Sequence, residues 1–420
     1  MDLIELNKDS YKEFCCKMDA HFLQSYEWGQ IAKFNGNNVY YLGLMDRGYL
    51  KATALLLKKE LPFNYSYFYI PRGFTIDYYN YDLVQTMSNL IRNFCLKHRA
   101  LFFKIDPDIR LHTIDDHAHI IGNYNNYKLV ETLTNIGFKH QKLTKFFETM
   151  QPRYTFRIDL EADIDSIESR YSRMTKSRLK KTLSNEVYIE MGNQNDIQDF
   201  IRLMKMTEKR QNFYSHSDKY YRYFYKVFSN SNMVDLYLAR VDIPKLRTKL
   251  FTRLQELNKN LNILCQVTNK KNDGQKRELQ KNIIAVNERL AMLKDCKEKE
   301  VIISASLVVH YNKKSWCLYM ANDNHYKSLF ANYAIYQRQI KDAFLRQDLF
   351  FDVFGTIGDP NSKSNLIGIH NFKRKWGGEY TEFIGEFDYV LHPILYYAYK
   401  MIIPIRRKIV NYNLRKKELK

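Results

Sequence analysis

The sequence predicts a mixed α/β (α+β) protein made of two similar units in tandem, with a long helical hairpin inserted in the second unit. Strand and helix patterns alternate over residues 1–150 and alternate again from residue 154, although no residue-level repeat links the two stretches. Between residues 244 and 300 the pattern changes to two helical apolar seams joined by a polar turn. A chain of 420 residues is also long enough to bury two or three cores.

The first unit is expected to contain a hairpin, a helix and a buried strand. Residues 39–45 and 50–57 both have strand-like composition, and the Asp-Arg-Gly sequence between them suits a tight turn. Residues 82–98 place apolar side chains at helical spacing. Residues 101–105 form a short apolar run that is typical of a buried strand.

The second unit is expected to repeat this plan. In chain order its predicted elements are a strand at 154–160, a helix at 195–209, strands at 234–241, 301–311 and 315–320, a helix at 333–346 and a strand at 350–354. The strands at 234–241 and 301–311 flank the helical hairpin, so the hairpin is expected to leave and re-enter one sheet.

The hairpin has the apolar spacing of an antiparallel coiled coil. Its two seams step by 4, 3, 4 and 3 residues, first at Leu250, Leu254, Leu257, Leu261 and Leu264, and then at Leu279, Ile283, Val286, Leu290 and Leu293. An arm of this kind fits a large partner, such as a tRNA or a second protein. An arm that serves only for dimerisation is the other interpretation.

The charge of the chain favours a polyanionic partner. It carries 66 Lys and Arg residues against 46 Asp and Glu residues, a formal net charge of +20, which suits nucleic acid, a phosphorylated substrate or an acidic membrane surface. The six cysteines form no CxxC pair and the first residues lack the pattern of a secretory leader, which predicts a reduced, cytoplasmic protein. No uncharged apolar run is long enough for a membrane span.

The C-terminal residues allow two interpretations. Residues 389–405 are apolar and rich in tyrosine, and the basic side chains that follow are Arg406, Arg407, Lys408, Arg415, Lys416, Lys417 and Lys420. An apolar-aromatic segment followed by a basic tail is suited to an anionic membrane surface. The same residues also fit a last helix docked on the body and followed by a solvated tail.

Short local motifs carry candidate chemistry. Trp28 and Lys33 fall near the expected start of a short helix, and a helix N-terminus beside a lysine is a natural phosphate site. Asp106 follows a buried strand, where α/β proteins place functional groups, although a turn-capping aspartate is the more common explanation. The Asp- and His-containing segment at 115–119 lacks metal-site spacing, so no metal is expected.

Several further motifs follow one another along the chain. They are Gln24-Ser25-x-x-Trp28-Gly-x-x-x-Lys33, Tyr69-Ile-Pro-Arg72-Gly73, Lys104-Ile-Asp106-Pro, the basic run from Arg173 to Lys181, Thr207-x-x-Arg210, Asp352-Val-Phe-Gly355-x-x-Gly358 and Phe372-Lys373. Together with the coiled-coil insertion they resemble the FemA/FemB/FemX family, the tRNA-dependent aminoacyltransferases that build peptidoglycan interpeptide bridges. The resemblance covers essentially the whole chain. It departs from the family pattern at Gly73-Phe74-Thr75, where a proline and a small apolar residue often follow the glycine.

The resemblance implies a pair of GNAT-like acyltransferase units with the substrate cleft in the first, and no cofactor. It implies transfer of Gly, Ala or Ser from aminoacyl-tRNA to a lipid-linked or nucleotide-linked muramyl peptide. Contact with the inner membrane surface and an oligomer with other bridge-forming enzymes are further possibilities. The acetyl-coenzyme A loop of ordinary GNAT enzymes, Arg/Gln-x-x-Gly-x-Gly/Ala, is not present in the sequence, which disfavours an acetyltransferase.

The resemblance also implies roles for individual residues. By position, Asp106 would orient or deprotonate the attacking amine, and Lys373, next to Phe372, would stabilise the charge that develops on the ester. The implied substrate-binding residues are Lys33 and Arg210 at the precursor's diphosphate, Tyr214 beside it, and Trp28 and Arg72. These residue types suit aminolysis, because the amine must lose a proton and the tetrahedral intermediate carries an oxyanion.

The expected domain division follows from the same resemblance. It comprises a first GNAT-like unit at 1–153, the first part of the second unit at 154–243, the coiled-coil arm at 244–300, the rest of the second unit at 301–388, and the apolar segment with its basic tail at 389–420. Two alternatives stay open. The chain could be a non-catalytic RNA-binding or coiled-coil scaffold of the same fold, or an enzyme of tRNA-dependent lipid aminoacylation, a class that usually has many transmembrane helices.

Overall fold

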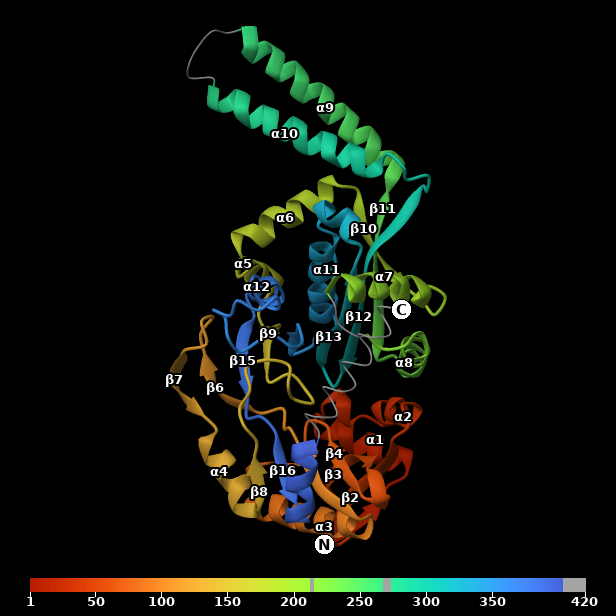
Figure 1. Cartoon of the computed structure of the whole chain (residues 1–420), viewed down its shortest axis with the longest axis vertical. Helices are drawn as coiled ribbons and strands as arrows, with labels where there is room; N and C mark the ends of the chain where they lie inside the picture. Colours follow the sequence, from red (N-terminus) through yellow and green to blue (C-terminus); the bar gives the residue numbers. More distant parts are fainter. Residues whose placement is uncertain (212–214, 267–272, 403–420) are drawn as a thin grey trace. The chain divides into compact units, whose positions relative to one another are not determined.

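The computed structural model describes residues 1–211, 215–266 and 273–402, and the chain divides into two compact units (Figure 1). Unit 1 comprises residues 1–157, 353–374 and those from 378 onward, and unit 2 comprises 158–352 and 375–377. Helices and sheet strands occur in both units, which confirms the predicted mixed α/β class.

Unit 1 is built on a seven-stranded sheet. In spatial order its strands are β1 (Asp2–Glu5), β2 (Asn38–Asp46), β3 (Tyr49–Glu60), β4 (Ser66–Ile70), β5 (Ala100–Ile105), β16 (Phe387–Val390) and β8 (Phe138–His140). Neighbouring strands are antiparallel except β4 and β5, which are parallel. The predicted hairpin at 39–57 and the buried strand at 101–105 are therefore confirmed as β2–β3 and β5.

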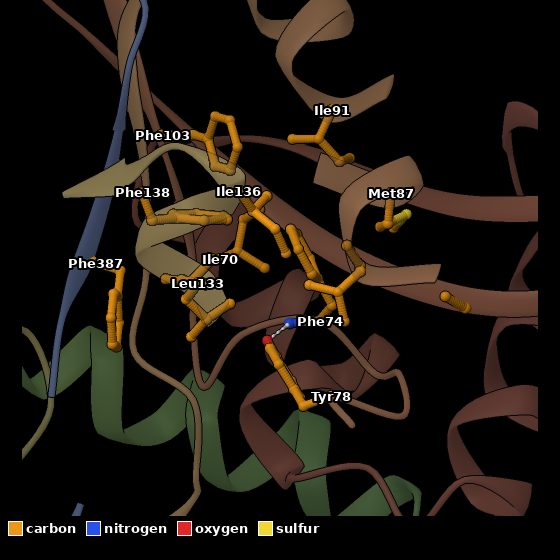
Figure 2. Close-up of a cluster of buried hydrophobic side chains, with 14 of the residues drawn as sticks. Ile70, Phe74, Tyr78, Met87, Ile91, Phe103, Leu133, Ile136, Phe138 and Phe387 are labelled. Atoms are coloured by element: carbon orange, nitrogen blue, oxygen red, sulfur yellow. Dashed lines mark hydrogen bonds between the residues drawn. The ribbon is translucent and has the colours of Figure 1, made fainter. Parts of the chain in front are cut away.

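Helices cover both faces of this sheet. They are α1 (Lys8–Lys17), α2 (Tyr26–Phe34), α3 (Tyr81–Lys97) and α4 (Tyr127–Ile136). Ala54 and Leu56 of β3 join a core that includes Met87 of α3 and Leu133 of α4 (Figure 2), whereas Thr53 lies against the thiol of Cys15 in α1. Successive strand residues point to opposite faces, so this alternation buries the strand on both sides.

Unit 1 also carries a smaller antiparallel ladder and a short helix. The ladder runs β9 (Tyr154–Asp159), β15 (Glu379–Phe383), β6 (Arg110–Ile114) and β7 (Ile120–Asn125), and the helix is α12 (Ile367–Arg374). The last residues of β9 already belong to unit 2.

Unit 2 has its own strands and helices. The strands are β10 (Val187–Gly192), β11 (Val234–Asp242), β12 (Glu300–Tyr311), β13 (Lys314–Asn322) and β14 (Phe350–Asp352), hydrogen-bonded in that order. The helices are α5 (Ile164–Ser169), α6 (Arg173–Ser184), α7 (Ile197–Gln211), α8 (Asp218–Asn230) and α11 (Ala331–Leu345). All the strands and helices predicted for the second unit are present, with ends that differ by a few residues, but the first of these strands, β9, lies mostly in unit 1.

The helical arm leaves unit 2 between two neighbouring strands. Helices α9 (Ile243–Gln266) and α10 (Asp273–Leu293) lie side by side (Figure 1), and the flanking strands β11 and β12 pair with each other. The predicted seam positions are buried or half-buried, with Leu257 and Leu293 almost fully enclosed. The insertion of a helical hairpin within one sheet is thus confirmed.

The units divide the chain differently from the expected boundaries. Residues 154–157, 353–374 and 378–388 were expected in the second unit, but they belong to unit 1. The physical reason is strand pairing at long range, because β15 pairs with β6 and β9, and β16 pairs with β5 and β8. Local sequence patterns do not reveal such pairings.

The chain after β16 continues into a further helix. Residues 393–402 are helical, and Tyr396 is buried against Phe102 of β5 with ring centroids 5.2 Å apart. This part of the C-terminus is docked on unit 1, as one of the two interpretations required. Across the residues that the structure describes, every helix is too short or too polar to span a membrane.

Candidate active site

Two parallel strands of unit 1 bring the main candidate residues to one sheet edge. Ile70 of β4 is the register partner of Ile105 of β5. The residues that follow each strand, Arg72 and Asp106, therefore emerge together, as expected at the carboxyl ends of parallel strands. Arg72 has a φ of 57° and Gly73 a φ of 78°. This left-handed turn is unusual for arginine and directs the backbone N–H of Arg72 toward Asp106.

The carboxyl group of Asp106 is enclosed and hydrogen-bonded on both oxygens. The Arg72 N–H donates to Oδ1 at 2.6 Å, and the Tyr69 hydroxyl donates to Oδ2 at 2.8 Å. Burial raises the pKa of Asp106 to about 7, and the negative charge of Glu386 acts in the same direction, while the charge of Arg72 and the two hydrogen bonds oppose the rise. A carboxyl group with this pKa exchanges a proton readily near neutral pH.

The nearby Asp108 has the opposite character. Burial alone would raise its pKa, but the guanidinium of Arg157, with His21 and Arg72 close by, holds the pKa of Asp108 well below its usual range. The Arg157 Nη2 atom lies 2.6 Å from Asp108 Oδ1. Two carboxyl groups close together in the sequence thus have pKa values shifted in opposite directions, and of the two Asp106 is the one suited to proton transfer at pH 7.

A buried network of ion pairs includes Glu386, whose charge acts on Asp106. The Lys104 ammonium lies 2.6 Å from Glu386 Oε2 and 2.8 Å from Asp388 Oδ1. Asp388 also accepts a hydrogen bond from the Tyr396 hydroxyl at 2.8 Å and pairs with Lys400 at 2.9 Å. Burial lowers the pKa of Lys104, but Asp388 and Glu386 together outweigh it and raise that pKa above its ordinary value. Lys104 therefore remains a cation and holds Glu386 near Asp106.

The side chain of Arg72 lies in an aromatic and carbonyl environment. Its guanidinium carbon is 4.5 Å from the centre of the Phe383 ring, and its Nη2 donates to the Pro152 carbonyl at 3.3 Å. Arg157 lies over the same Phe383 ring at 4.9 Å. Within the described part of the chain the Nε atom of Arg72 is buried without a hydrogen-bond partner. The expected substrate-binding Arg72 is therefore placed directly beside the candidate base.

Lys373 is held by the loop that follows β14. Its ammonium donates to the carbonyls of Phe354 at 2.6 Å and Gly355 at 2.7 Å. Phe354 has a φ of 58°, which turns these carbonyls toward α12. A side chain on Gly355 would place its Cβ 2.5 Å from Cγ of Pro152, and one on Gly358 would clash with Tyr154. The two glycines of the sequence motif are therefore required by close packing.

Contacts within unit 1 connect Asp106 with Lys373. The backbone of Arg72 binds Asp106, the side chain of Arg72 binds the Pro152 carbonyl, Pro152 packs against Gly355, and Gly355 binds Lys373. The neighbouring Phe372 is half-buried on the same helix, α12. The two residues predicted to carry the chemistry are thus separated by a short series of packed residues.

The predicted position of Lys33 at a helix N-terminus is wrong. Helix α2 begins at Tyr26, capped by the Ser25 side chain, and Lys33 lies in its last turn, about 10 Å further along the axis at 1.5 Å per residue. Lys33 is exposed and forms no ion pair or hydrogen bond with a described residue. It therefore is not part of a helix N-terminal phosphate site.

Gln24 and Trp28 of the same motif make contacts within unit 1. Gln24 donates to the Pro71 carbonyl at 2.6 Å and accepts from the Leu55 N–H at 2.8 Å, which ties the segment before α2 to the turn that holds Arg72. Trp28 packs edge-on against Phe22 at 6.0 Å. The Nε1 atom of Trp28 is buried, and it has no hydrogen-bond partner among the described residues.

Arg210 belongs to unit 2. It lies in the last turn of α7, is exposed, and donates to the Asn322 carbonyl at 3.1 Å. The hydroxyl of Thr207, from the same motif, accepts the N–H of Asn322 at 3.1 Å. Tyr214 lies outside the described residues.

Two residues that contact or influence Asp106, Tyr69 and Glu386, could not be assigned these roles from the sequence. Tyr69 stands in a motif that was identified, but its contact with Asp106 depends on the parallel pairing of β4 with β5. Glu386 is far from Asp106 in the sequence and approaches it only because β16 pairs with β5. The sequence offered one local signal, and it concerned Tyr69: this residue lies near the end of one strand, and Asp106 follows the end of another.

Known proteins resemble this chain over nearly its whole length. A family model described as the FemAB family matches residues 6–403. The lipid II:glycine glycyltransferase of Staphylococcus aureus (strain bovine RF122 / ET3-1) is 26% identical over 399 residues, with 92% of each chain covered. That of Staphylococcus epidermidis (strain ATCC 12228 / FDA PCI 1200) is 26% identical over 396 residues, with the same coverage. A crystal structure of FemX shares the fold, with a TM-score of 0.75, 24% identity, and coverage of 95% of this chain and 99% of that chain. Because the family model spans nearly all of the sequence, the chain belongs to the FemAB family.

Proposed function

We propose that this protein transfers an amino acid from an aminoacyl-tRNA to an amine on the peptide stem, or on the growing interpeptide bridge, of a lipid-linked peptidoglycan precursor. The observation that carries the proposal is the buried carboxyl group of Asp106, whose pKa of about 7 suits a general base. Family membership and the similarity to two glycyltransferases that act on lipid II support the same reaction class.

The reaction forms one bond and breaks another. The amine nitrogen attacks the ester carbonyl of the aminoacyl-tRNA, the new C–N bond forms, and the ester C–O bond breaks with release of the tRNA hydroxyl. The attacking nitrogen loses one proton and the ribose oxygen gains one, so the sum is neutral. No redox partner is required. The barrier comes from the proton on the amine and from the negative charge on the tetrahedral intermediate.

Asp106 is assigned to the proton. In its ionised form the carboxylate accepts the proton of the attacking nitrogen and returns it to the leaving oxygen. The hydrogen bonds from Tyr69 and from the Arg72 N–H orient both carboxyl oxygens. A residue oriented in this way does not have to reorganise during the reaction.

Lys373 is assigned to the oxyanion. The carbonyls of Phe354 and Gly355 fix the position of its ammonium group, and a fixed cation stabilises developing negative charge better than a mobile one. The packed residues between Asp106 and Lys373 keep the proton acceptor and the cation at a constant separation.

Lys33 and Arg210 are assigned to the diphosphate of the precursor, with Tyr214, Trp28 and Arg72 as further substrate contacts. Both Lys33 and Arg210 are exposed cations, and a diphosphate requires cationic donors. The names of the two relatives favour glycine among the three amino acids expected. A lipid-linked acceptor also favours action at the cytoplasmic face of the membrane.

The test is a transfer assay with tRNAs charged with Gly, Ala or Ser and with lipid-linked and nucleotide-linked precursors. Product is expected with at least one charged tRNA, and Asp106→Asn should lower the rate by about two to four orders of magnitude. The matched control is Asp77→Asn, an exposed aspartate in the loop after β4. If no charged tRNA supports transfer while RNA binding is retained, the chain is a non-catalytic scaffold of this fold.

A further inference from the structure

The helix at residues 393–402 leaves several large apolar side chains exposed, although its inner side is also filled by aromatic residues. Its one charged side chain, Lys400, turns toward unit 1 and pairs with the buried Asp388 at 2.9 Å. Tyr396, only 1% exposed, fills the same inner side. The exposed large apolar residues of this helix are Ile394 at 85%, Leu395 at 36%, Tyr397 at 51%, Met401 at 69% and Ile402 at 59%.

These exposed residues form a stripe. Ile394, Tyr397 and Met401 are spaced by three and four residues, so they lie on one helix face. A surface helix of a globular protein normally directs its apolar stripe inward. Contiguous apolar surface facing outward marks an interaction site.

A second exposed apolar side chain belongs to the same region of unit 1. Phe63 is 88% exposed and has a φ of 60°, a left-handed conformation that is costly for a bulky residue. Its neighbours Leu61 and Tyr65 pack on the small core cluster that contains Tyr396. The turn that presents Phe63 is therefore anchored beside the C-terminal helix.

Cations border this apolar surface. Lys139 donates to the Tyr397 hydroxyl at 2.9 Å, and the guanidinium of Arg99 lies 5.0 Å from the centre of the Tyr65 ring. Both Lys139 and Arg99 are exposed. The sequence that continues after residue 402 adds seven Lys and Arg residues against one Glu. An apolar stripe with a cationic border and a basic continuation is complementary to a bilayer with anionic headgroups.

We infer that the outer face of residues 393–402, together with Phe63, is a docking surface for an anionic lipid bilayer. The inference rests on the proposed function in one respect, because a lipid-linked acceptor explains why an aminoacyltransferase would dock on a membrane. The surface itself is independent of the chemistry. Apolar side chains insert at the headgroup boundary, while Lys139 and Arg99 contact the phosphates.

The test is vesicle flotation of the full-length protein without tRNA or precursor. Vesicles of phosphatidylglycerol and phosphatidylcholine should bind the protein, and vesicles of phosphatidylcholine alone should bind it at least about tenfold more weakly. The double variant Ile394→Ser/Met401→Ser should lose at least about tenfold in affinity for the anionic vesicles. The matched control is Leu183→Ser/Leu345→Ser, two residues of unit 2 that are 80% and 75% exposed, and it should bind like the wild type.

A second measurement separates this surface from catalysis. The Ile394→Ser/Met401→Ser variant should aminoacylate a detergent-solubilised lipid-linked precursor at the wild-type rate and a vesicle-embedded precursor more slowly. Unchanged vesicle affinity of this variant would overturn the inference. So would loss of a wild-type dimer in the variant, measured by light scattering without vesicles, because a second copy would then be the occupant. Absence of transfer by a wild-type protein that binds vesicles would refute the proposed function and leave the docking surface standing.

Discussion

The hydroxyl of Tyr69 donates a 2.8 Å hydrogen bond to Oδ2 of Asp106. Tyr69 is the register partner of Lys104 in the parallel pair β4–β5, so the strand pairing sets this contact. The hydrogen bond stabilises the ionised carboxylate and acts against the rise in pKa that burial causes. The balance leaves the pKa of Asp106 at about 7, where the group is useful as a base.

Replacing Tyr69 with Phe should move the pH dependence of transfer to higher pH. The change removes a hydrogen bond that favours the ionised form, so the pKa of Asp106 rises. Since only the ionised form accepts a proton, the rate should then increase with pH later than in the wild type, whose midpoint is expected near 7. The measurement is kcat/KM for transfer between pH 5.5 and 9.

The control for this variant is Tyr67→Phe on the same strand. The Tyr67 ring stacks on Phe102 with centroids 4.9 Å apart. The variant keeps this ring and loses only the hydroxyl, so its pH profile should be unchanged. A Tyr69→Phe profile that coincides with the wild-type profile would show that Asp106 does not set the pH dependence.

Replacing Asp106 with Asn should stabilise the protein as the pH rises. The folded wild-type carboxyl group holds its proton up to about pH 7, whereas an unfolded chain loses it near the ordinary value of 3.8. The contribution of this group to the free energy of unfolding is therefore full below 3.8 and is lost as the pH rises to 7. Asn does not titrate, so the Tm of the variant minus that of the wild type should increase across this window and then stay constant.

Asp108→Asn is the matched opposite case. The pKa of Asp108 is depressed by Arg157 despite burial, so the ionised carboxylate stabilises the folded state throughout the same window. This variant should melt below the wild type at pH 5 and at pH 7.5. If the Tm difference for Asp106→Asn does not change between these two pH values, the raised pKa is not a property of the folded protein.

The strands and helices were predictable because their signals are local. The seam through Leu257 and Val286 and the amphipathic pattern of α3 depend only on spacing along the chain. Asp106 was also accessible to sequence analysis, since it directly follows an apolar strand and precedes a proline. Lys33 was predicted near the helix N-terminus because the sequence pattern indicated where the helix starts but not how long it is. The helix has nine residues, so Lys33 lies in its last turn, far from its first.

The arrangement around Asp106 required contacts that no local pattern encodes. Glu386 affects the pKa of Asp106 only because Phe387 pairs with Ile105 across the sheet. The return of the chain to unit 1 after Val353 has the same origin. Strand register between distant segments depends on the whole sheet. A single sequence shows neither which strand pairs with which nor the register of the pairing.

Replacing Lys373 with Ala should abolish transfer while precursor binding survives. The proposed role of the ammonium belongs to the transition state, so its loss should lower kcat by about a hundredfold or more with little change in the precursor Kd. Single-turnover rates and equilibrium binding of the precursor separate the two effects. The control is Lys363→Ala, an exposed lysine before α12, which should be neutral.

Gly355→Ala tests the same role of Lys373 by changing the loop whose carbonyl accepts its hydrogen bond. The added Cβ would lie 2.5 Å from Pro152, so the loop that holds Lys373 must shift. A loss of kcat in the same direction as for Lys373→Ala is expected. Gly368→Ala, with nothing within 4 Å of its Cβ position, should behave like the wild type. Near-normal turnover of Lys373→Ala would remove this residue from the mechanism.

Lys33→Ala and Arg210→Ala should each weaken binding of the diphosphate-bearing precursor. Both side chains are exposed, so their attraction to phosphate is screened by salt, and the wild-type affinity should fall as ionic strength rises. The measurement is the precursor Kd between 50 and 300 mM salt. If either variant binds a precursor that lacks the diphosphate much worse than the wild type does, that residue is not a phosphate ligand.

Replacing residues 245–299 with a short Gly/Ser linker should leave the body folded and reduce its interaction with a partner. Asp242 and Glu300 are register partners at the ends of β11 and β12, so a short linker is able to close the hairpin without the arm. The apolar seam is used between α9 and α10, which leaves their basic outer faces for a tRNA or a second protein of the pathway. We expect the deletion variant to show lower tRNA affinity or loss of self-association. Its melting temperature, measured in parallel, reports whether the body is folded.

A shorter deletion separates the arm's outer part from its anchor. At the base of the arm, Arg247 of α9 donates to the Leu293 carbonyl of α10 at 2.8 Å, which joins the two helices. Arg289 of α10 donates to the Asn185 side chain at 2.9 Å, which binds the arm to the body of unit 2. Replacing residues 255–287 keeps these contacts and should preserve the melting temperature. If partner binding depends on the outer part, both deletions should lose it equally, since the outer part is what they share. A full deletion that keeps tRNA affinity, oligomeric state and transfer rate would show that the arm is dispensable.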